Sequence, residues 1–521
     1  MHSARPLFRT LTAGAAVTAL LATSACSFGP DHENSSLADG PAVQPTPVFE
    51  GEHTDFVTRP DLADFPTQLT EGEAYQDRLE GYIPASPRIE ENPPAEQPIG
   101  NVIVDTDANT VWLQNRDHLN PEHDTTYNLH FQQYQGEPVL TWWEGATHAG
   151  WGFGEIVIAN ASYEEIARIA PTEGIVDVEP DFHEFRLTDN DTLLTLYYQP
   201  TQTDLTAVGG PVDGWVMDGV FQEYDVETGE LLFEWSALDH VPVTASMWDY
   251  PVEIDRDPNV GTELLPFDYF HINSVHYDAD DTDTFLISAR NTHAVYSVDR
   301  DTGELNWTLG GRYSDYDMGE DGYFGWQHDV QRAEDGTIQI FDNASEPAMR
   351  ENSRVINFEL DDDDMVAHLV RQLDPPEQRR ADYMANAEAT DSGHVMVGWG
   401  YEPFFTQYTP DGEVTIDVDH SPYINYRSYI SEDWTGTPQE APALAVEGDS
   451  VFVSWNGATE VAQWRLFSGA DEENAEFREV ADWDGFETEL TAPEDGYLAV
   501  QALDDNGDVL AASYLDATAT T

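Results

Sequence analysis

Short strand-like runs separated by tight turns recur through most of this 521-residue chain. The runs are rich in β-branched and aromatic side chains, and turns such as Asp-x-x-Thr-Gly-Glu at 225–230 and 299–304 divide them. This spacing predicts an all-β sandwich, barrel or propeller. A module that begins with a polar residue before a strand recurs every 50 to 90 residues or so, roughly the length of a four-stranded propeller blade with insertions.

We therefore predict an all-β protein with two folded domains. Residues 98–436 are expected to form a β-propeller, with six blades as the predicted number. Residues 437–521 contain several short strands and a hairpin turn, which predict a fibronectin-III-like or immunoglobulin-like β-sandwich with Trp455 as a core candidate. Residues 26–97 are acidic and rich in proline, and we interpret them as a flexible linker.

The N-terminus has the pattern of an export signal. Residues 1–25 contain two arginines, then an apolar run and then small residues, and Cys26 follows as the single cysteine. This order resembles a bacterial lipoprotein cleavage box, so we predict a lipid on Cys26 and a protein anchored at the cell surface. Plain secretion is the alternative. A transmembrane anchor is disfavoured because the apolar run is shorter than roughly 20 residues.

The charge of the chain further limits the classes of function that are open to it. The chain has 100 acidic residues against 21 basic ones, all of them arginine, and its formal net charge is −79. Acid spread along the whole chain suits a halophilic protein, because the Debye length falls to about 3 Å at 1 M salt. Nucleic-acid binding is not expected without a basic face. The absence of lysine excludes phosphate-loop and Schiff-base lysines.

Three histidines stand at similar places in successive modules: His183, His271 and His328. In a propeller the innermost strand of each blade faces the central channel, so equivalent positions converge on the axis. Arg290 ends a strand-like run, and its guanidinium presents a planar fork that suits oxyanions. Asn273 lies two residues from His271, on the same face of a strand. We expect these side chains to surround one anionic group.

Other interpretations of these residues remain open. A single histidine is often structural, Arg290 has many carboxylates as alternative partners, and Asn273 is also suited to a turn cap or an internal hydrogen bond. The histidines with Asp329 are an alternative transition-metal site, but their spacing matches no known metal motif, so we predict no metal.

Taken as a set, several short motifs resemble the arylsulfotransferase family, in the bacterial and fungal branch that works without the nucleotide sulfate donor PAPS. The resemblance covers about residues 55 to 515. The matching segments are 181–185 (Asp-Phe-His-Glu-Phe), 220–230, 271–275 (His-Ile-Asn-Ser-Val), 288–292 (Ser-Ala-Arg-Asn-Thr), 303–311, 327–330 (Gln-His-Asp-Val), 341–343 (Phe-Asp-Asn), 397–400 and 454–460.

This resemblance implies a six-bladed propeller with its site in the channel, and sulfuryl transfer from a phenolic sulfate ester to another phenol through a sulfated histidine, with no cofactor. It implies that His328 is the nucleophile and that His271, Asn273 and Arg290 hold the sulfuryl oxygens. His183 is similar to a further channel histidine. Characterised bacterial members carry a disulfide, which a chain with one cysteine cannot form.

Two other functions are compatible with the sequence. The first is a non-catalytic surface propeller lipoprotein that binds a ligand or partner. The second is a metal-dependent hydrolase or lyase.

Overall fold

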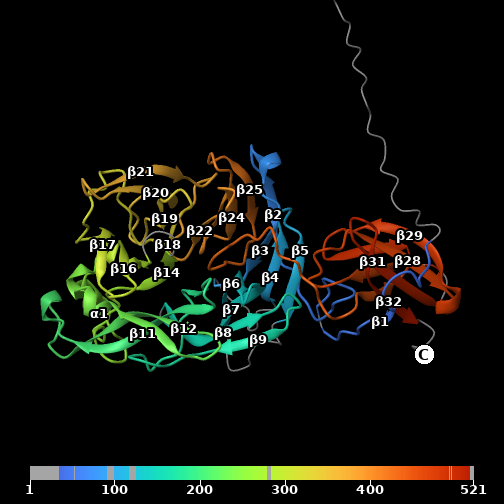
Figure 1. Ribbon diagram of the computed structural model, residues 1–521, viewed down its shortest axis with the longest axis horizontal. Helices are drawn as coiled ribbons and strands as arrows, with labels where there is room; N and C mark the ends of the chain where they lie inside the picture. The colour runs from blue at the N-terminus through green and yellow to red at the C-terminus, as the bar shows by residue number, and fades with distance from the viewer. Residues whose placement is uncertain are drawn as a thin grey trace, which may run out of the picture.

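The structure is a computed structural model that describes residues 35–51, 53–90, 99–115, 125–148, 150–278, 283–491, 493 and 496–516. The predicted signal peptide (1–25) and Cys26 lie outside the described residues. The described chain is almost entirely β, and it forms a β-propeller with a separate β-sandwich at one side (Figure 1). No helix in the described part of the chain has the length and apolar character that crossing a membrane requires.

Four antiparallel sheets of four strands follow one another in chain order. Their strands are β6 (Thr125–Tyr134), β7 (Glu137–His148), β8 (Trp151–Ala159), β9 (Glu165–Ile169); β10 (Phe185–Leu187), β11 (Thr192–Thr203), β12 (Gly214–Asp225), β13 (Leu231–Ser236); β14 (Ile272–Asp278), β15 (Thr284–Ala289), β16 (Ala294–Asp299), β17 (Leu305–Gly310); β18 (His328–Arg332), β19 (Ile338–Asp342), β20 (Arg354–Asp361) and β21 (Val366–Leu373). Each sheet is a meander, and the first strands contact those of neighbouring sheets, as β6 does β10 and β14 does β18. The first strand of each sheet is therefore the innermost one.

Two further sheets complete the ring. One contains β22 (Asn386–Ala389), β23 (Val395–Gly398), β24 (Phe404–Tyr408) and β25 (Val414–Asp419), with β2 (Gln68–Glu71) added antiparallel to β25. The other contains β3 (Tyr82–Ala85), β4 (Ile99–Asp105) and β5 (Thr110–Asn115). Along its inner edge, bridges join Arg88 to Ile424 and Tyr82 to Ser431, so residues 424–431 return to the axis. The six blades stay a prediction, although the described residues of this region form six sheets.

The structure differs from the predicted linker at 26–97. Within this range, β2 and β3 belong to the propeller sheets, and Leu62, Phe65 and Ile83 are buried in one cluster with Val418. These strands have only four residues each; β2 is mostly exposed and β3 is mostly buried, so neither has the alternation that marks a strand in sequence. The segment closes the ring rather than tethering it.

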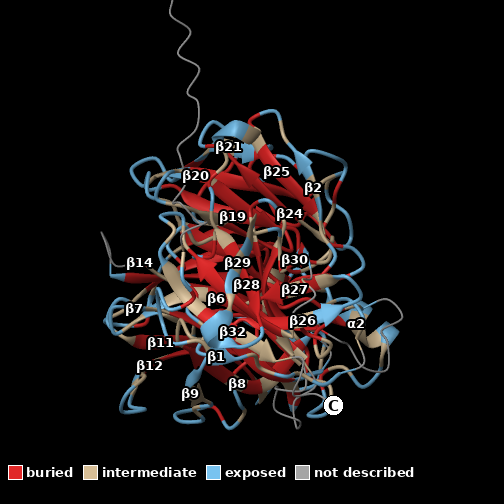
Figure 2. Cartoon of the chain, turned by 90° about the vertical axis from the view of Figure 1, so that its right-hand side faces the viewer, coloured by how far each residue is buried: buried red, intermediate tan, exposed pale blue. Residues whose placement is uncertain are grey.

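The sandwich packs two sheets. The larger contains β1 (Gln44–Pro45), β28 (Gln463–Gly469), β29 (Glu476–Asp482), β31 (Tyr497–Leu503) and β32 (Val509–Asp516), and the smaller contains β26 (Ala443–Glu447), β27 (Ser450–Ser454) and β30 (Glu487–Thr491). Trp464 is the buried tryptophan of this core, whereas Trp455, the predicted candidate, is only partly buried at its edge. Buried residues follow the strands of both domains (Figure 2).

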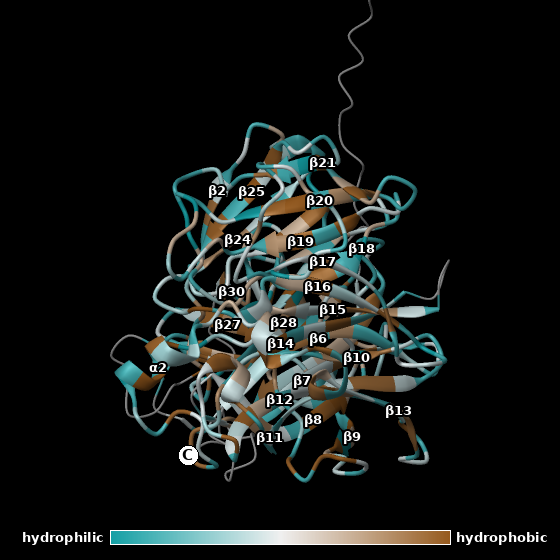
Figure 3. Ribbon diagram, turned by 90° about the vertical axis from the view of Figure 1, so that its left-hand side faces the viewer, coloured by the Kyte–Doolittle hydropathy of each residue, from teal (hydrophilic) through white to brown (hydrophobic). Residues whose placement is uncertain are grey.

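One long connection, residues 237–271, separates β13 from β14 and holds the two helices, α1 (Ala237–His240) and α2 (Tyr250–Arg256). Helix α2 projects from the side of the propeller and alternates polar and apolar residues (Figure 3). Trp248 and Phe267 of this connection reach the channel and line its main cavity. The connection therefore forms a wall of the site described next.

Candidate active site

A cavity of about 530 Å³ lies where the inner strands β10, β14 and β18 begin. His183, His271, Arg290 and His328 all line it, although up to 145 positions separate them in the chain. The rings of His183 and His271 meet edge to face, with centroids 5.1 Å apart. The structure thus brings four of the five predicted site residues within the described chain to one cavity.

His328 opens strand β18 and is buried. Its Nδ1 lies 2.8 Å from Oδ1 of Asn343, and its Nε2 accepts a longer hydrogen bond, 3.3 Å, from the backbone N–H of Met384. Burial, reinforced by the positive charge of Arg290, holds the pKa of His328 well below its usual value. The imidazole is therefore neutral at physiological pH, and its Nε2 electron pair, which accepts the 3.3 Å hydrogen bond from Met384, must leave that bond before it attacks another atom.

His183 and His271 are each held by an aspartate. Nδ1 of His271 lies 2.5 Å from Oδ2 of Asp268, and Nδ1 of His183 lies 2.5 Å from Oδ1 of Asp181. Burial raises the pKa of Asp181 to about 7, although the backbone N–H groups of His183 and Gly152 donate to its carboxyl oxygens and oppose the rise. Because each aspartate binds Nδ1, Nε2 is the nitrogen of each ring that is left to exchange a proton with a molecule in the cavity.

Arg290 follows β15, and its backbone N–H donates to the carbonyl of His271 at 2.9 Å, which fixes the two residues together. Its guanidinium carbon lies 4.8 Å from the ring centre of Trp326 and 5.8 Å from that of Trp248. Among the described residues no carboxylate lies within 4.0 Å of it, and its Nε has no hydrogen-bond partner. Burial lowers the pKa of this guanidinium, but arginine stays charged near pH 7.

Asn273 does not line the cavity, contrary to the predicted role of holding sulfuryl oxygens. It is fully buried in β14, and its Nδ2 donates to the carbonyl of Gln327 at 2.8 Å. Because Gln327 precedes His328, Asn273 supports the backbone beneath that histidine. Its spacing from His271 places both on one strand face only if the strand is regular, and the pairing of β14 shifts between Ile272 and Ser274.

Aromatic side chains form much of the cavity wall. Among them are Tyr127, Trp151, Phe182, Trp248, Phe267 and Tyr426. Tyr127 and Phe182 stack with centroids 4.2 Å apart, and Phe182 stacks at the same spacing on His183. Such a wall suits the flat face of an aryl ring next to the polar groups.

The family model of the arylsulfotransferases (ASST) matches residues 130–421, more than half of the chain, and this span contains the three cavity histidines and Arg290. The chain belongs to the arylsulfotransferase family. Comparison with curated proteins gives no match.

Solved structures resemble this arylsulfotransferase-family chain only loosely. A protein of unknown function from Bacteroides caccae is 10% identical, with a TM-score of 0.39 over 67% of this chain and 98% of the other. The virginiamycin B lyase of Staphylococcus aureus is 8% identical, with a TM-score of 0.32 over 76% of this chain and 97% of that one. At these scores the likenesses carry no argument about activity.

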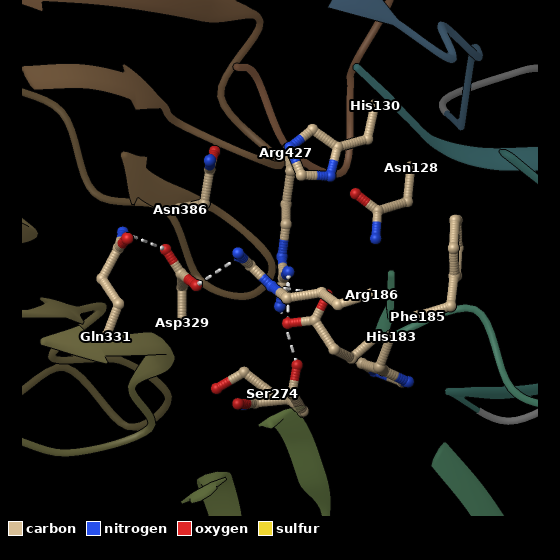
Figure 4. Close-up of polar contacts among 12 residues, drawn as sticks. Asn128, His130, His183, Phe185, Arg186, Ser274, Asp329, Gln331, Asn386 and Arg427 are labelled. Carbon is tan, nitrogen blue, oxygen red and sulfur yellow. Dashed lines mark hydrogen bonds and ion pairs between the residues drawn. The ribbon is translucent and has the colours of Figure 1, made fainter. Parts of the chain in front are cut away.

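Deeper in the channel, the arylsulfotransferase-family chain buries a network of charged side chains that its sequence motifs do not predict. Arg427 donates to Oε2 of Glu184 at 2.8 Å and to the carbonyl of Asn273 at 2.8 Å, while Arg186 lies 3.4 Å from Glu184 and 3.9 Å from Asp329. Figure 4 shows Arg186, Arg427 and Asp329 converging from different parts of the ring. Arg427 arrives on residues 424–431, which carry no strand pattern, so sequence reasoning missed it.

The carboxylates and histidines of the described residues include no group of three or more with the geometry to hold a metal ion. The two Asp–His pairs instead hold their rings by Nδ1 just before β10 and β14, and the Asn–His pair holds His328 in the same way at the start of β18. What the arrangement offers chemically is one neutral nucleophile, two imidazoles for proton transfer and one cation without a carboxylate partner, since the other arginine of the lining, Arg88, is paired with Glu90 at 2.6 Å.

Proposed function

We propose that this protein is an exported aryl sulfotransferase, which moves a sulfuryl group from a phenolic sulfate ester to a phenol through a sulfohistidine on His328. The observation that carries the proposal is the meeting of a neutral His328 and an ion-pair-free Arg290 in one aromatic cavity. A sulfate ester has the two parts that such a cavity accepts, an aryl ring and an anionic group.

In the first half-reaction Nε2 of His328 attacks sulfur in line with the leaving phenol oxygen. The N–S bond forms as the S–O bond breaks, and negative charge spreads over the sulfuryl oxygens and the leaving oxygen, much as in phosphoryl transfer. The fork of Arg290 lies where those oxygens develop charge, and one such fixed donor lowers a barrier by about 3–4 kcal/mol. Nη1 of Arg290 donates to Oδ1 of Asn291 at 3.1 Å, and Nε, which has no hydrogen-bond partner, is left for the substrate.

The leaving phenolate takes a proton from the Nε2 of His183 or His271, and the acceptor phenol later returns one to the same ring. The ring is charged before the first transfer and again after the second, and its aspartate, Asp181 or Asp268, stabilises that charged form; between the two transfers the ring is neutral. Phenol oxygen then attacks sulfur, the S–N bond breaks, and His328 is restored as neutral imidazole. Both half-reactions use one cavity, so ping-pong kinetics are expected.

The site of action is part of the proposal. The pattern at 1–26 supports export and a lipid on Cys26, and the acidic surface, with a net charge of −79, supports work in high salt. Growth with a radiolabelled fatty acid tests the anchor: label is expected in the membrane-bound protein and lost in Cys26→Ser. Unlabelled wild-type protein in the medium would favour plain secretion.

The function is tested with purified protein in high salt, 4-nitrophenyl sulfate as donor and phenol as acceptor. Release of nitrophenol is expected, and His328→Ala should reduce it by roughly 10⁴-fold or more. His394→Ala is the matched control, because His394 is half-buried and bonded to Ser392 and to the carbonyl of Asp77, and it does not line the cavity. Binding of the ester without turnover by wild-type protein would contradict the proposal and support a non-catalytic propeller.

A further inference from the structure

The partner of His328 is an amide, whereas the partners of the other two cavity histidines are carboxylates. Asn343 follows β19, the strand that pairs with β18, and it is fully buried. Its position next to the ring is therefore set by the sheet itself. The difference between an amide and a carboxylate decides what the ring can do.

The hydrogen bonds of Asn343 fix which way its amide faces. Its Nδ2 donates to the carbonyl of Ala381 at 3.0 Å and to the carbonyl of Met384 at 2.9 Å. Backbone carbonyls only accept, so both hydrogens of the amide are used, and a flipped amide would set oxygen against two oxygens. Oδ1 must therefore be the atom that faces His328.

An amide oxygen accepts and cannot donate, so Nδ1 of His328 must carry the hydrogen of the neutral ring. The electron pair is then on Nε2. We propose that Asn343 is the positioning residue that, together with the Met384 N–H that donates to Nε2, fixes His328 as the Nδ1–H tautomer and so keeps the electron pair on Nε2. The catalytic meaning of this tautomer rests on the proposed sulfuryl transfer; the tautomer itself does not.

Chemistry explains why an amide suits this position. Once Nε2 carries the sulfuryl group, the ring is a good leaving group only if Nδ1 keeps its hydrogen, because it then departs as neutral imidazole rather than as imidazolate. A carboxylate would draw that proton away and would also favour the protonated free ring, which has no electron pair to attack with. The amide of Asn343 orients the ring without removing the Nδ1 proton and without favouring the protonated ring.

The charged and titratable groups around the ring bear on any pH measurement. Arg290, His183 and His271 face it across the cavity, and Asp329 is its neighbour in β18. Asp181 and Asp268 act through the two histidines, and Asp268, Glu346 and Asp382 act through Arg290. Arg290 and burial together lower the pKa of His328, which keeps the wild-type ring neutral.

The tautomer is tested directly on the full-length protein in high salt, with ¹⁵N-labelled histidine and two-bond ¹H–¹⁵N NMR spectra at neutral pH. The signal that disappears in His328→Gln is expected to show hydrogen on Nδ1. Hydrogen on Nε2 in that signal overturns the proposal, whether or not the protein transfers sulfuryl groups. The expected tautomer in a protein without turnover would leave the proposal intact and count against the proposed function alone.

Two variants test the role in transfer. Asn343→Leu should leave the tautomer dependent on the longer Met384 bond alone, so the fraction with hydrogen on Nε2 should rise and kcat/KM for 4-nitrophenyl sulfate should fall roughly 10- to 100-fold. Asn343→Asp should raise the pKa of His328, so the acid limb of the rate profile should move to higher pH, and turnover of the sulfohistidine should slow more than its formation. Unchanged tautomer, pH limb and rates in both variants would overturn the proposal.

Asn357→Leu is the matched control. Asn357 is also buried in this sheet, and its Nδ2 donates to Oγ1 of Thr337, far from the cavity lining. It should lose stability as Asn343→Leu does, with an unchanged pH profile. A profile that shifts equally in the control would show that loss of packing, rather than the amide on His328, causes the effect.

Discussion

The cavity and the deeper channel lie on the same axis and use the same residue types, yet they treat arginine in opposite ways. In the channel, Arg427 and Arg186 are matched by Glu184 and Asp329. In the cavity, Arg290 has no described carboxylate within 4.0 Å, although acidic residues outnumber basic ones by 100 to 21. Under the proposed function, the arginine without a carboxylate partner binds the ligand, and the two arginines with carboxylate partners stabilise the fold.

The largest expected difference in stability between the cavity and the deeper channel is at Arg427. Arg427→Met should reduce the free energy of unfolding by about 3–5 kcal/mol, because it leaves the carboxylate of Glu184 buried with only the more distant Arg186. Urea unfolding in high salt measures the loss. The double variant Arg427→Met/Glu184→Leu should recover most of it, and a single variant as stable as wild type would show that the network is not structural.

Arg290 should give the reverse result. Arg290→Gln should lower kcat/KM for the aryl sulfate by about 10²–10³-fold, as loss of one oxyanion donor does. Its urea midpoint should not fall, because no buried carboxylate loses a partner. Arg290→Lys keeps the charge but loses the planar fork, so it should recover only part of the rate. A large loss of stability in Arg290→Gln would erase the distinction between the two regions.

Within the cavity, the titration of Asp181 tests how this carboxyl group controls proton transfer by His183. Burial raises its pKa to about 7, so below that pH the carboxyl keeps its proton and directs it to Nδ1 of His183. Above it, the carboxylate accepts Nδ1–H and Nε2 becomes a base. Acceptor-dependent turnover should therefore rise about tenfold per pH unit up to pH 7 and then level off. Asp181→Asn should remove this bend in stopped-flow assays; a bend that persists assigns it elsewhere.

Salt should have the smallest effect. The negative field of the whole chain opposes entry of an aryl sulfate. Of the two described arginines that line the cavity, Arg88 is paired with Glu90 at 2.6 Å, so Arg290 is the one that opposes that field without a paired carboxylate. Because the Debye length falls from about 10 Å at 0.1 M to about 3 Å at 1 M, KM for the ester should fall several-fold over this range. The uncharged phenol is the control, and its KM should stay constant. Equal changes for both would indicate a change in folding instead.

Strand patterns and motifs predicted the propeller, the sandwich and the four residues that share the cavity. The sequence could do this because histidines that open successive inner strands are repeated at the module spacing. The partners of those histidines were not predicted. Asp181 and Asp268 lie within three residues of their rings, but nothing in an acidic chain distinguishes them from other aspartates.

The other errors have one physical origin. Closure of a ring joins segments far apart in the chain, and such pairings leave little local signal. Strand β2 pairs with β25, and Arg427 reaches Glu184 across 243 positions. Asn273 was misplaced for a related reason, since a register shift in β14 turns its side chain away from that of His271.

Ring closure by residues 424–431 also sets an order of assembly. The charge pair beneath the catalytic cavity needs Arg427, and Tyr426 supplies part of the cavity wall, so neither is complete while the chain up to β25 is all that has emerged. If the chain is exported unfolded, as proposed above, it would be inert until late in its translocation, and the proposed sulfuryl transfer would begin only on the far side of the membrane.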